Sequence, residues 1–131
     1  MMYIALDGDD AGRKIEKYLI ENKERDVAEL SEQITNDVQE ITAYLQRFGF
    51  EIIFSAGDSI LCKGESVDIR NLSNYLAKKN KICTFSVGIG NTLEKTYVAL
   101  KYAKSGGKNT IVNYNENDQL VLQQINFERF K

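Results

Sequence analysis

Two short acidic segments contain the residues of this sequence that are best suited to chemistry. Residues 6–10 read LDGDD and follow an apolar run near the amino terminus, and residues 55–59 read SAGDS between two other apolar runs. Carboxylate oxygens are ligands for Mg²⁺ or Mn²⁺, and Mg²⁺ commonly uses one or two carboxylates together with substrate phosphates. We interpret the two segments as halves of one site for a divalent metal and a nucleoside triphosphate.

The composition limits the kinds of catalytic and binding site that the protein can have. The 131 residues include no histidine, 17 basic and 19 acidic side chains, and a net charge of -2. The absence of histidine excludes Ser-His-Asp and Cys-His nucleophile systems and histidine-containing zinc sites. With so small a net charge we expect no stable nucleic-acid binding, and any phosphate must be held by a local site.

The length and the 43% hydrophobic composition predict a single core. We expect residues 1–114 to form the main domain and residues 115–131 to be a C-terminal extension of it. No apolar run approaches the roughly 18 residues that span a bilayer, and no signal sequence is recognisable, which predicts a cytoplasmic protein with no membrane partner. Cys62 and Cys83 are each predicted to be buried apolar residues within strands.

Hydrophobic periodicity predicts the elements that position the acidic segments. Helix caps are expected at Asp9 or Asp10, at Gly49, and at Asn91 or Thr92, and Gly57 with Asp58 is expected to form a two-residue hairpin turn. The order β-α-α-β-β-α-β-α-β predicts an α+β, ferredoxin-like (RRM-like) fold with a mostly antiparallel sheet. The predicted strands cover residues 2–6, 50–55, 59–63, 82–90 and 109–114, and the predicted helices cover residues 10–23, 27–48, 66–79 and 92–105, with one further short element after 115.

Chain direction predicts which residues meet at one edge of this sheet. If the first strand runs upward, the helical crossover makes the second strand run upward too, so Asp7 and Asp58 arrive at the same edge. The last helix ends at this edge and brings Lys104 and Lys108. The first helix begins there, and its unpaired amides at residues 10–12 can face an anion.

Each of these features also has a purely structural interpretation. Asp-Gly and Gly-Asp are common turn dipeptides, and lysines near the end of a helix are usually solvated charges favoured by the helix dipole. Asp9 and Asp10 can be nothing more than helix caps. The convergence of all these residues on one edge favours the functional interpretation.

Four motifs resemble the palm domain shared by GGDEF nucleotide cyclases, the large subunit of type III CRISPR complexes and the minimal CRISPR polymerases called mCpol. They are LDGDDAG at residues 6–12, AGDS at 56–59, FSVGIG at 85–90 and ALKYAKSGGKN at 99–109. The resemblance covers residues 2 to about 114. The small size and the Asp-Gly-Asp form of the first motif make mCpol the closest match.

The resemblance implies a role for each site residue. Asp7 and Asp58 would be the catalytic, metal-bound carboxylates, with the Gly8 carbonyl completing the set and Mg²⁺ or Mn²⁺ as the cofactor. Asp9 and Ser59 would be accessory. The groups implied to hold the triphosphate are the amides of Asp10 and Ala11, with Gly12 beside them, and the side chains of Lys104 and Lys108.

The family joins nucleotides by attack of a ribose hydroxyl on an α-phosphate, and it makes cyclic signalling nucleotides. This implies a cyclic di- or oligonucleotide product, a homodimer at least, and a nucleotide-responsive effector in antiviral defence. Ile15 stands where GGDEF cyclases carry a guanine-reading asparagine, which favours ATP. Ser59 replaces the second acid of the turn motif, so a degenerate palm that binds nucleotide without turnover stays open. A GTP cyclohydrolase-like ring hydrolase is the other alternative.

Overall fold

The computed structural model describes residues 1–79 and 82–125, which form a six-stranded sheet with four helices. The elements follow the predicted order, and the further short element expected after residue 115 is a strand. They are β1 (Met2–Gly8), α1 (Ala11–Ile20), α2 (Glu24–Arg47), β2 (Glu51–Ala56), β3 (Ser59–Gly64), α3 (Ile69–Lys78), β4 (Phe85–Gly90), α4 (Leu93–Ser105), β5 (Thr110–Tyr114) and β6 (Leu120–Gln124).

The strand order in the sheet is β2-β3-β1-β4-β5-β6. Strand β1 pairs antiparallel with both β3 and β4, β2 pairs antiparallel with β3, and only β4 and β5 are parallel. The first four strands therefore have the ferredoxin-like arrangement, and the predicted α+β fold with a mostly antiparallel sheet is confirmed. The sixth strand, β6, pairs with β5 and extends this sheet.

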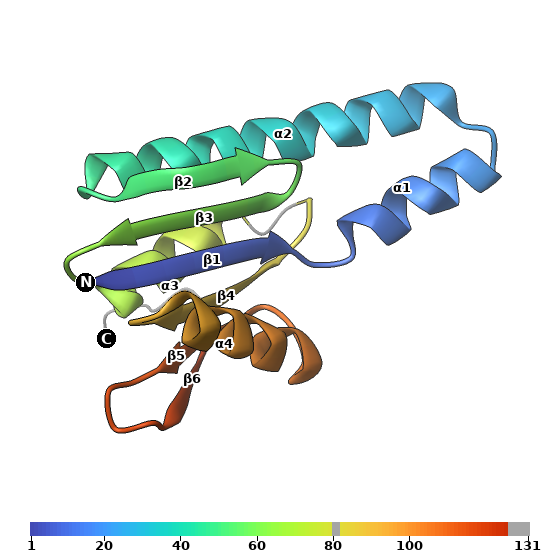
Figure 1. The fold of residues 1–131 in the computed structure, drawn as a ribbon. Helices are drawn as coiled ribbons and strands as arrows, with labels where there is room; N and C mark the ends of the chain where they lie inside the picture. Colours follow the sequence, from blue (N-terminus) through green and yellow to red (C-terminus); the bar gives the residue numbers. More distant parts are fainter. Residues whose placement is uncertain (80–81, 126–131) are drawn as a thin grey trace, which may run out of the picture.

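Helices cover the two faces of the sheet unequally. Helices α2 and α3 pack on one face, where their apolar residues meet Ile4, Leu6 and the buried residues of β3 and β4. Helix α4 lies on the other face, over β4 and β5, where Ala99 and Ala103 meet Val112. Figure 1 shows α4 on this face, and among the described elements none covers β2 and β3 there. Part of the sheet next to α4 is therefore exposed.

Strand β4 is buried on both faces, because its successive residues face α2 and α3 on one side and α4 on the other. Phe85, Val87 and Ile89 belong to the core under α2 and α3. Gly88 faces α4, where an added Cβ would lie 2.4 Å from the backbone nitrogen of Leu100. Only glycine permits this close approach, which fixes the position of α4 on the sheet.

Helices α1 and α2 pack against each other, and α1 and the first turns of α2 extend past the end of β1, which defines an α1–α2 arm. The apolar residues of α2 that are spaced by three or four positions are buried, as this periodicity predicts: Leu30, Ile34, Val38, Ile41 and Leu45. The same periodicity predicts that Leu19 on α1 and Phe48 after α2 are buried, and this is wrong, because they are 60% and 55% exposed. Leu19 lies on the arm beyond the sheet, and Phe48 is the C-cap residue of α2 and packs on Tyr44 at the surface.

Several local predictions are confirmed and two are corrected. Gly49 ends α2 with a φ of 89°, and the Thr92 side chain caps α4 by accepting from the Lys95 amide. Strand β4 begins at Phe85 rather than at residue 82, so Cys83 lies outside the strand, although it is buried and free as expected. Asp10 is the N-cap residue of α1, but its side chain makes no capping hydrogen bond.

Among residues 1–79 and 82–125, none of the helices is both long enough and apolar enough to cross a membrane.

Candidate active site

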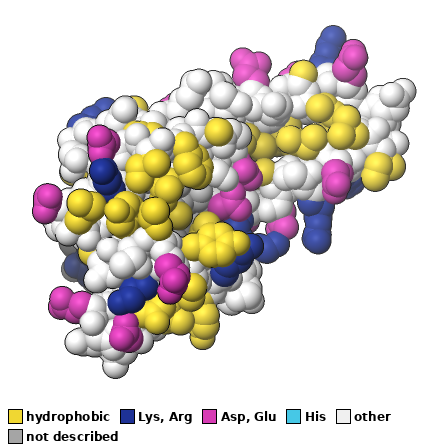
Figure 2. All heavy atoms as spheres, in the orientation of Figure 1, with side chains coloured by type: hydrophobic (Ala, Val, Ile, Leu, Met, Phe, Trp, Pro, Cys, Tyr) yellow, Lys and Arg dark blue, Asp and Glu magenta, His cyan; other side chains and the backbone are white. Residues whose placement is uncertain are grey.

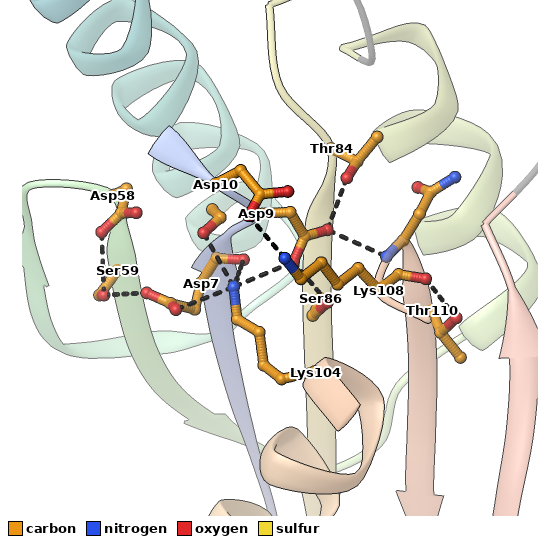
Figure 3. A network of polar contacts seen from close by, with 12 residues as sticks. Asp7, Asp9, Asp10, Asp58, Ser59, Thr84, Ser86, Lys104, Lys108 and Thr110 are labelled. Carbon is orange, nitrogen blue, oxygen red and sulfur yellow. Dashed lines mark hydrogen bonds and ion pairs between the residues drawn. The ribbon is translucent and has the colours of Figure 1, made fainter. Parts of the chain in front are cut away.

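Asp7 and Asp58 meet at the end of the sheet where β1 ends and β3 begins. Asp7 is the cross-strand partner of Ser59, and the Gly8 amide donates to the Asp58 carbonyl at 3.0 Å. The Ser59 hydroxyl donates to Asp7 Oδ1 at 2.6 Å and lies 3.4 Å from Asp58 Oδ1 (Figure 3). The strand directions therefore bring the two carboxylates together, with Ser59 between them.

Gly8 allows Asp58 to lie against the backbone of β1. A Cβ added at Gly8 would be 3.0 Å from both Cβ and Oδ2 of Asp58. This contact is tighter than most real Cβ contacts, so a larger residue would displace the carboxylate. The Gly8 carbonyl oxygen accepts from Lys104 Nζ at 2.8 Å, which places it within the same polar cluster.

Lys104 reaches this cluster from the last turn of α4. Its ammonium lies 3.0 Å from Asp7 Oδ2 and 2.9 Å from Asp9 Oδ1. Burial favours the neutral amine, but the hydrogen bonds to Asp9 and Asp7 outweigh it and raise the pKa of Lys104. Lys104 is therefore charged and sits directly on the predicted metal ligands.

Asp9 is the most buried acid of the site, with a side chain that is 2% exposed. Its Oδ2 accepts from Thr84 Oγ1 at 2.5 Å and from the Asn109 amide at 2.9 Å. Its Oδ1 accepts from Ser86 Oγ at 2.7 Å, besides Lys104. Burial opposes ionisation, but these four donors together hold the pKa of Asp9 below its ordinary value.

Asp10 and Lys108 form a second ion pair beside the first, with Lys108 Nζ 2.5 Å from Asp10 Oδ1. The hydrogen bond from Lys108 lowers the pKa of Asp10. Asp10, Lys108 and Asn109 have φ values of 59°, 66° and 49°. Asp and Asn adopt this left-handed region readily, whereas it is uncommon for lysine, so Lys108 is the strained residue of the three.

The electrostatics leave Asp58 in an unfavourable environment for its negative charge, because Lys104 forms its ion pair with Asp7. Burial, followed by repulsion from Asp7, raises the pKa of Asp58 above its ordinary value. A divalent cation between the two carboxylates would remove this repulsion. Among the described residues no group of three or more Cys, His, Asp and Glu is arranged to hold a metal. Two carboxylates and the Gly8 carbonyl still fit Mg²⁺, which takes its remaining ligands from water and phosphate oxygens.

The start of α1 lies beside the two carboxylates and is the part of the site predicted to bind an anion. Ala11 and Gly12 lie in its first turn, where backbone amides have no partner within the helix, and Asp10 precedes them. A hollow of about 250 Å³ adjoins this turn and is bounded by Ile15, Thr35 and Asp58, together with Ala11, Gly12, Ser31, Ile34 and Gly57. The hollow is mostly apolar and lies directly beside the acids, which suits a nucleobase.

Every residue singled out from the sequence lies at this end of the sheet. The structure adds three that the sequence interpretation missed: Thr84, Ser86 and Asn109, which all donate to Asp9. The role of Ser86 could have been inferred from the alternation of side chains along the strand. Ser86 lies opposite Asp7 in the β1–β4 pair, so the two residues share the face of the sheet that α4 covers. The signal for Asn109 was its place in the terminal motif, next to Lys108.

A ferredoxin-like sheet that carries two aspartates, two lysines and a helix start at one edge defines a palm of the polymerase and cyclase class. The model of the minimal CRISPR polymerase domain (mCpol) matches residues 3–114. The chain therefore belongs to the minimal CRISPR polymerase family, and the resemblance seen in the motifs is confirmed.

A solved structure supports the same fold. The chain is similar to a diguanylate cyclase/phosphodiesterase from Caldicellulosiruptor saccharolyticus, with a TM-score of 0.51 and 16% sequence identity over 92% of this chain and 78% of the other. At this identity the likeness shows the fold alone. No curated protein matches the sequence.

Proposed function

We propose that this protein is a metal-dependent nucleotidyltransferase that joins nucleoside triphosphates into a cyclic di- or oligonucleotide and releases pyrophosphate. The observation that carries the proposal is the meeting of Asp7, Asp58 and the Gly8 carbonyl beside the first turn of α1 and two lysines. Membership of a polymerase family and a cyclase-like fold support it.

The proposed reaction assigns a task to each group. A ribose hydroxyl oxygen bonds to the α-phosphorus, the bond to the β-phosphate oxygen breaks, and the hydroxyl proton passes to solvent. Asp7, Asp58 and the Gly8 carbonyl would hold Mg²⁺ or Mn²⁺, which when bound would lower the pKa of the attacking hydroxyl and stabilise the leaving pyrophosphate. The amides of Asp10, Ala11 and Gly12, with Lys104 and Lys108, would bind the β- and γ-phosphates.

The hollow beside Asp58 favours ATP as the substrate. Ile15 lies on its wall and offers no hydrogen bond to the edge of a guanine base. Ser31 and Thr35 are the only side chains with hydroxyls among the residues that bound it. An Ile15→Asn variant is expected to increase the use of GTP relative to ATP, measured as the ratio of the two kcat/KM values.

We also propose that the protein forms a homodimer. One palm binds one donor nucleotide, so joining two nucleotides requires that two sites face each other. In the proposed role the product activates a nucleotide-responsive effector in antiviral defence, as family membership suggests.

The proposed function is tested by incubating the protein with each of the four nucleoside triphosphates and Mg²⁺, and measuring pyrophosphate release. Asp7→Ala and Asp58→Ala should each abolish release while circular dichroism stays unchanged, because both side chains are partly exposed at the end of the sheet. Full activity in both variants would contradict the site. No release from any nucleotide would contradict the enzyme.

A second candidate is a palm that binds a nucleotide without turnover. The observation in its favour is Ser59, which stands where a second acid is expected and donates to Asp7 Oδ1. Under this candidate, nucleotide binds tightly, no pyrophosphate is released, and affinity is the same with Mg²⁺, Mn²⁺ or no metal. Formate release from GTP would instead identify a ring hydrolase.

A further inference from the structure

Lys104 occupies oxygens that the proposed function assigns to the metal. Its ammonium lies 3.0 Å from Asp7 Oδ2, 2.8 Å from the Gly8 carbonyl and 2.9 Å from Asp9 Oδ1. The Asp7 carbonyl is more distant, at 3.4 Å. An ammonium has three protons to donate, and these near oxygens take all of them. If the Asp7 carboxylate and the Gly8 carbonyl bind a metal, Asp9 is the one close partner that Lys104 keeps, besides the more distant Asp7 carbonyl.

Asp9 cannot become a metal ligand while it keeps its present hydrogen bonds. Its side chain is buried, and each of its oxygens already accepts two hydrogen bonds, from Thr84 and the Asn109 amide on one side and from Ser86 and Lys104 on the other. A carboxylate accepts about four hydrogen bonds in all, so Asp9 is saturated. Turning Asp9 toward a metal would leave buried donors without partners, which is costly.

We propose that Asp9 is the positioning residue for the triphosphate lysines and is not a metal ligand. It holds Lys104 at the site after Asp7 and Gly8 have been given to the metal, so that the freed protons of the ammonium face the phosphates. This inference rests on the proposed function. Figure 3 shows Asp9 beside Lys104, Thr84 and Ser86, of which Ser86 belongs to β4 and Thr84 directly precedes it.

The same carboxylate also fixes the segment that carries Lys108. Asp9 Oδ2 accepts from the amide of Asn109, the residue directly after Lys108, and both residues adopt the left-handed conformation. A hydrogen bond to an ionised acceptor is about twice as strong as a neutral one, so it stabilises the backbone of this segment. One buried acid thus positions Lys104 by its side chain and Lys108 through the backbone.

The test is a double-mutant cycle on nucleotide binding. Calorimetry with a non-hydrolysable ATP analogue and Mg²⁺ compares the wild type with Asp9→Asn, Lys104→Met and the double variant. Each single variant should bind about tenfold more weakly or worse, the usual cost of a lost charge-assisted hydrogen bond. In the Lys104→Met background, Asp9→Asn should cost less than half as much on the logarithmic scale, because Asp9 acts largely through Lys104.

Metal binding separates a positioning residue from a ligand. Binding of Mn²⁺ alone, followed by electron paramagnetic resonance, should survive in Asp9→Asn and be lost in Asp7→Asn. The matched control is Asp118→Asn, which makes the same change in an acid paired with another α4 residue, Lys95, away from the site. Asp118 has a φ of 57°, which asparagine accepts, so this control should bind like the wild type.

The outcomes that overturn the inference are distinct. Fully additive losses in the cycle would make Asp9 merely structural, and loss of Mn²⁺ in Asp9→Asn would make it a ligand. Failure of the wild type to bind the analogue would instead contradict the proposed function. If Asp9→Asn does not fold, ¹⁵N NMR of the wild-type lysines decides. The slowly exchanging Lys104 ammonium signal should persist on adding Mg²⁺, and its disappearance would contradict the proposal.

Discussion

At the scale of single residues, the site contains acids in two opposite environments. Asp9 is surrounded by donors, and its pKa is lowered, whereas Asp58 is desolvated beside another carboxylate, and its pKa is raised. Acids whose pKa values are driven apart by their surroundings tend to have different tasks. We therefore assign Asp9 a positioning role and Asp58 a role in binding the cation.

Asp58 is therefore expected to destabilise the metal-free protein at neutral pH. Because its pKa is raised in the folded state, its contribution to stability is fully present below the ordinary aspartate pKa and is lost as pH rises through the folded pKa. Asp58→Asn should melt at a higher temperature than the wild type in EDTA at pH 7, with the difference shrinking toward pH 4. It should also lose the stabilisation that Mn²⁺ gives the wild type.

Thermal melts from pH 4 to pH 8, with EDTA or Mn²⁺, check this expectation. Ser59→Ala is a suitable comparison, because it alters the same cluster without changing its charge. A melting temperature of Asp58→Asn at or below that of the wild type at pH 7 in EDTA would contradict the account.

At the scale of elements, the position of Lys104 depends on how closely α4 approaches β4. Gly88→Ala would put a Cβ 2.4 Å from the Thr96 carbonyl oxygen and the Leu100 nitrogen, so α4 must shift away from the sheet. Overpacking of this kind costs about 1–3 kcal/mol of the free energy of unfolding. Urea unfolding should show a lower midpoint and an unchanged slope.

Gly12→Ala is the matched control for Gly88→Ala. A Cβ at Gly12 meets nothing within 4 Å, and the residue lies in the first turn of α1. Alanine is favoured over glycine in a helix by about 0.5–1 kcal/mol, so this variant should be as stable as the wild type or more so. Gly88→Ala being no less stable than Gly12→Ala would contradict the proposed tight packing of α4.

The sequence predicted the meeting of Asp7 and Asp58 because it depends only on strand direction, which a crossover connection determines. It placed the start of β4 too early because residues 82–84 are apolar or β-branched like a strand, yet they lie before the first residue of β4. The role of Asp9 was not predictable in the same way. Its four donors come from β4, its preceding loop, α4 and residue 109, which only tertiary packing brings together.

At the scale of the whole molecule, the uncovered face of the sheet carries an apolar hollow next to the site. It has a volume of about 330 Å³ and is bounded by Asp7, Ser59, Phe54, Leu93 and Tyr97 together with Ala5, Leu6, Ile60, Leu61, Thr96 and Leu100. Figure 2 shows hydrophobic side chains gathered over these strands. We propose that this exposed apolar surface is an interaction site, where a second copy would complete the proposed joining of two nucleotides.

We therefore predict that the homodimer forms through this face of the sheet. Light scattering should give the wild type the mass of two chains. Tyr97→Glu, at a residue that is 58% exposed, should give a monomer that binds nucleotide but forms no product. Ile20→Glu makes the same kind of change on the α1–α2 arm, at a residue that is 86% exposed, and should stay dimeric. A monomeric wild type with full activity would contradict the dimer.

The central claim is that Asp7 and Asp58 share a metal and support the joining of nucleotides. The most direct test is mass spectrometry of the products that the wild type and Asp58→Ala form from ATP and Mg²⁺. The account predicts a product whose mass is a whole number of adenylate units without terminal phosphate, formed with one pyrophosphate per unit and absent from Asp58→Ala. Unchanged ATP, or the same product from the variant, would contradict it.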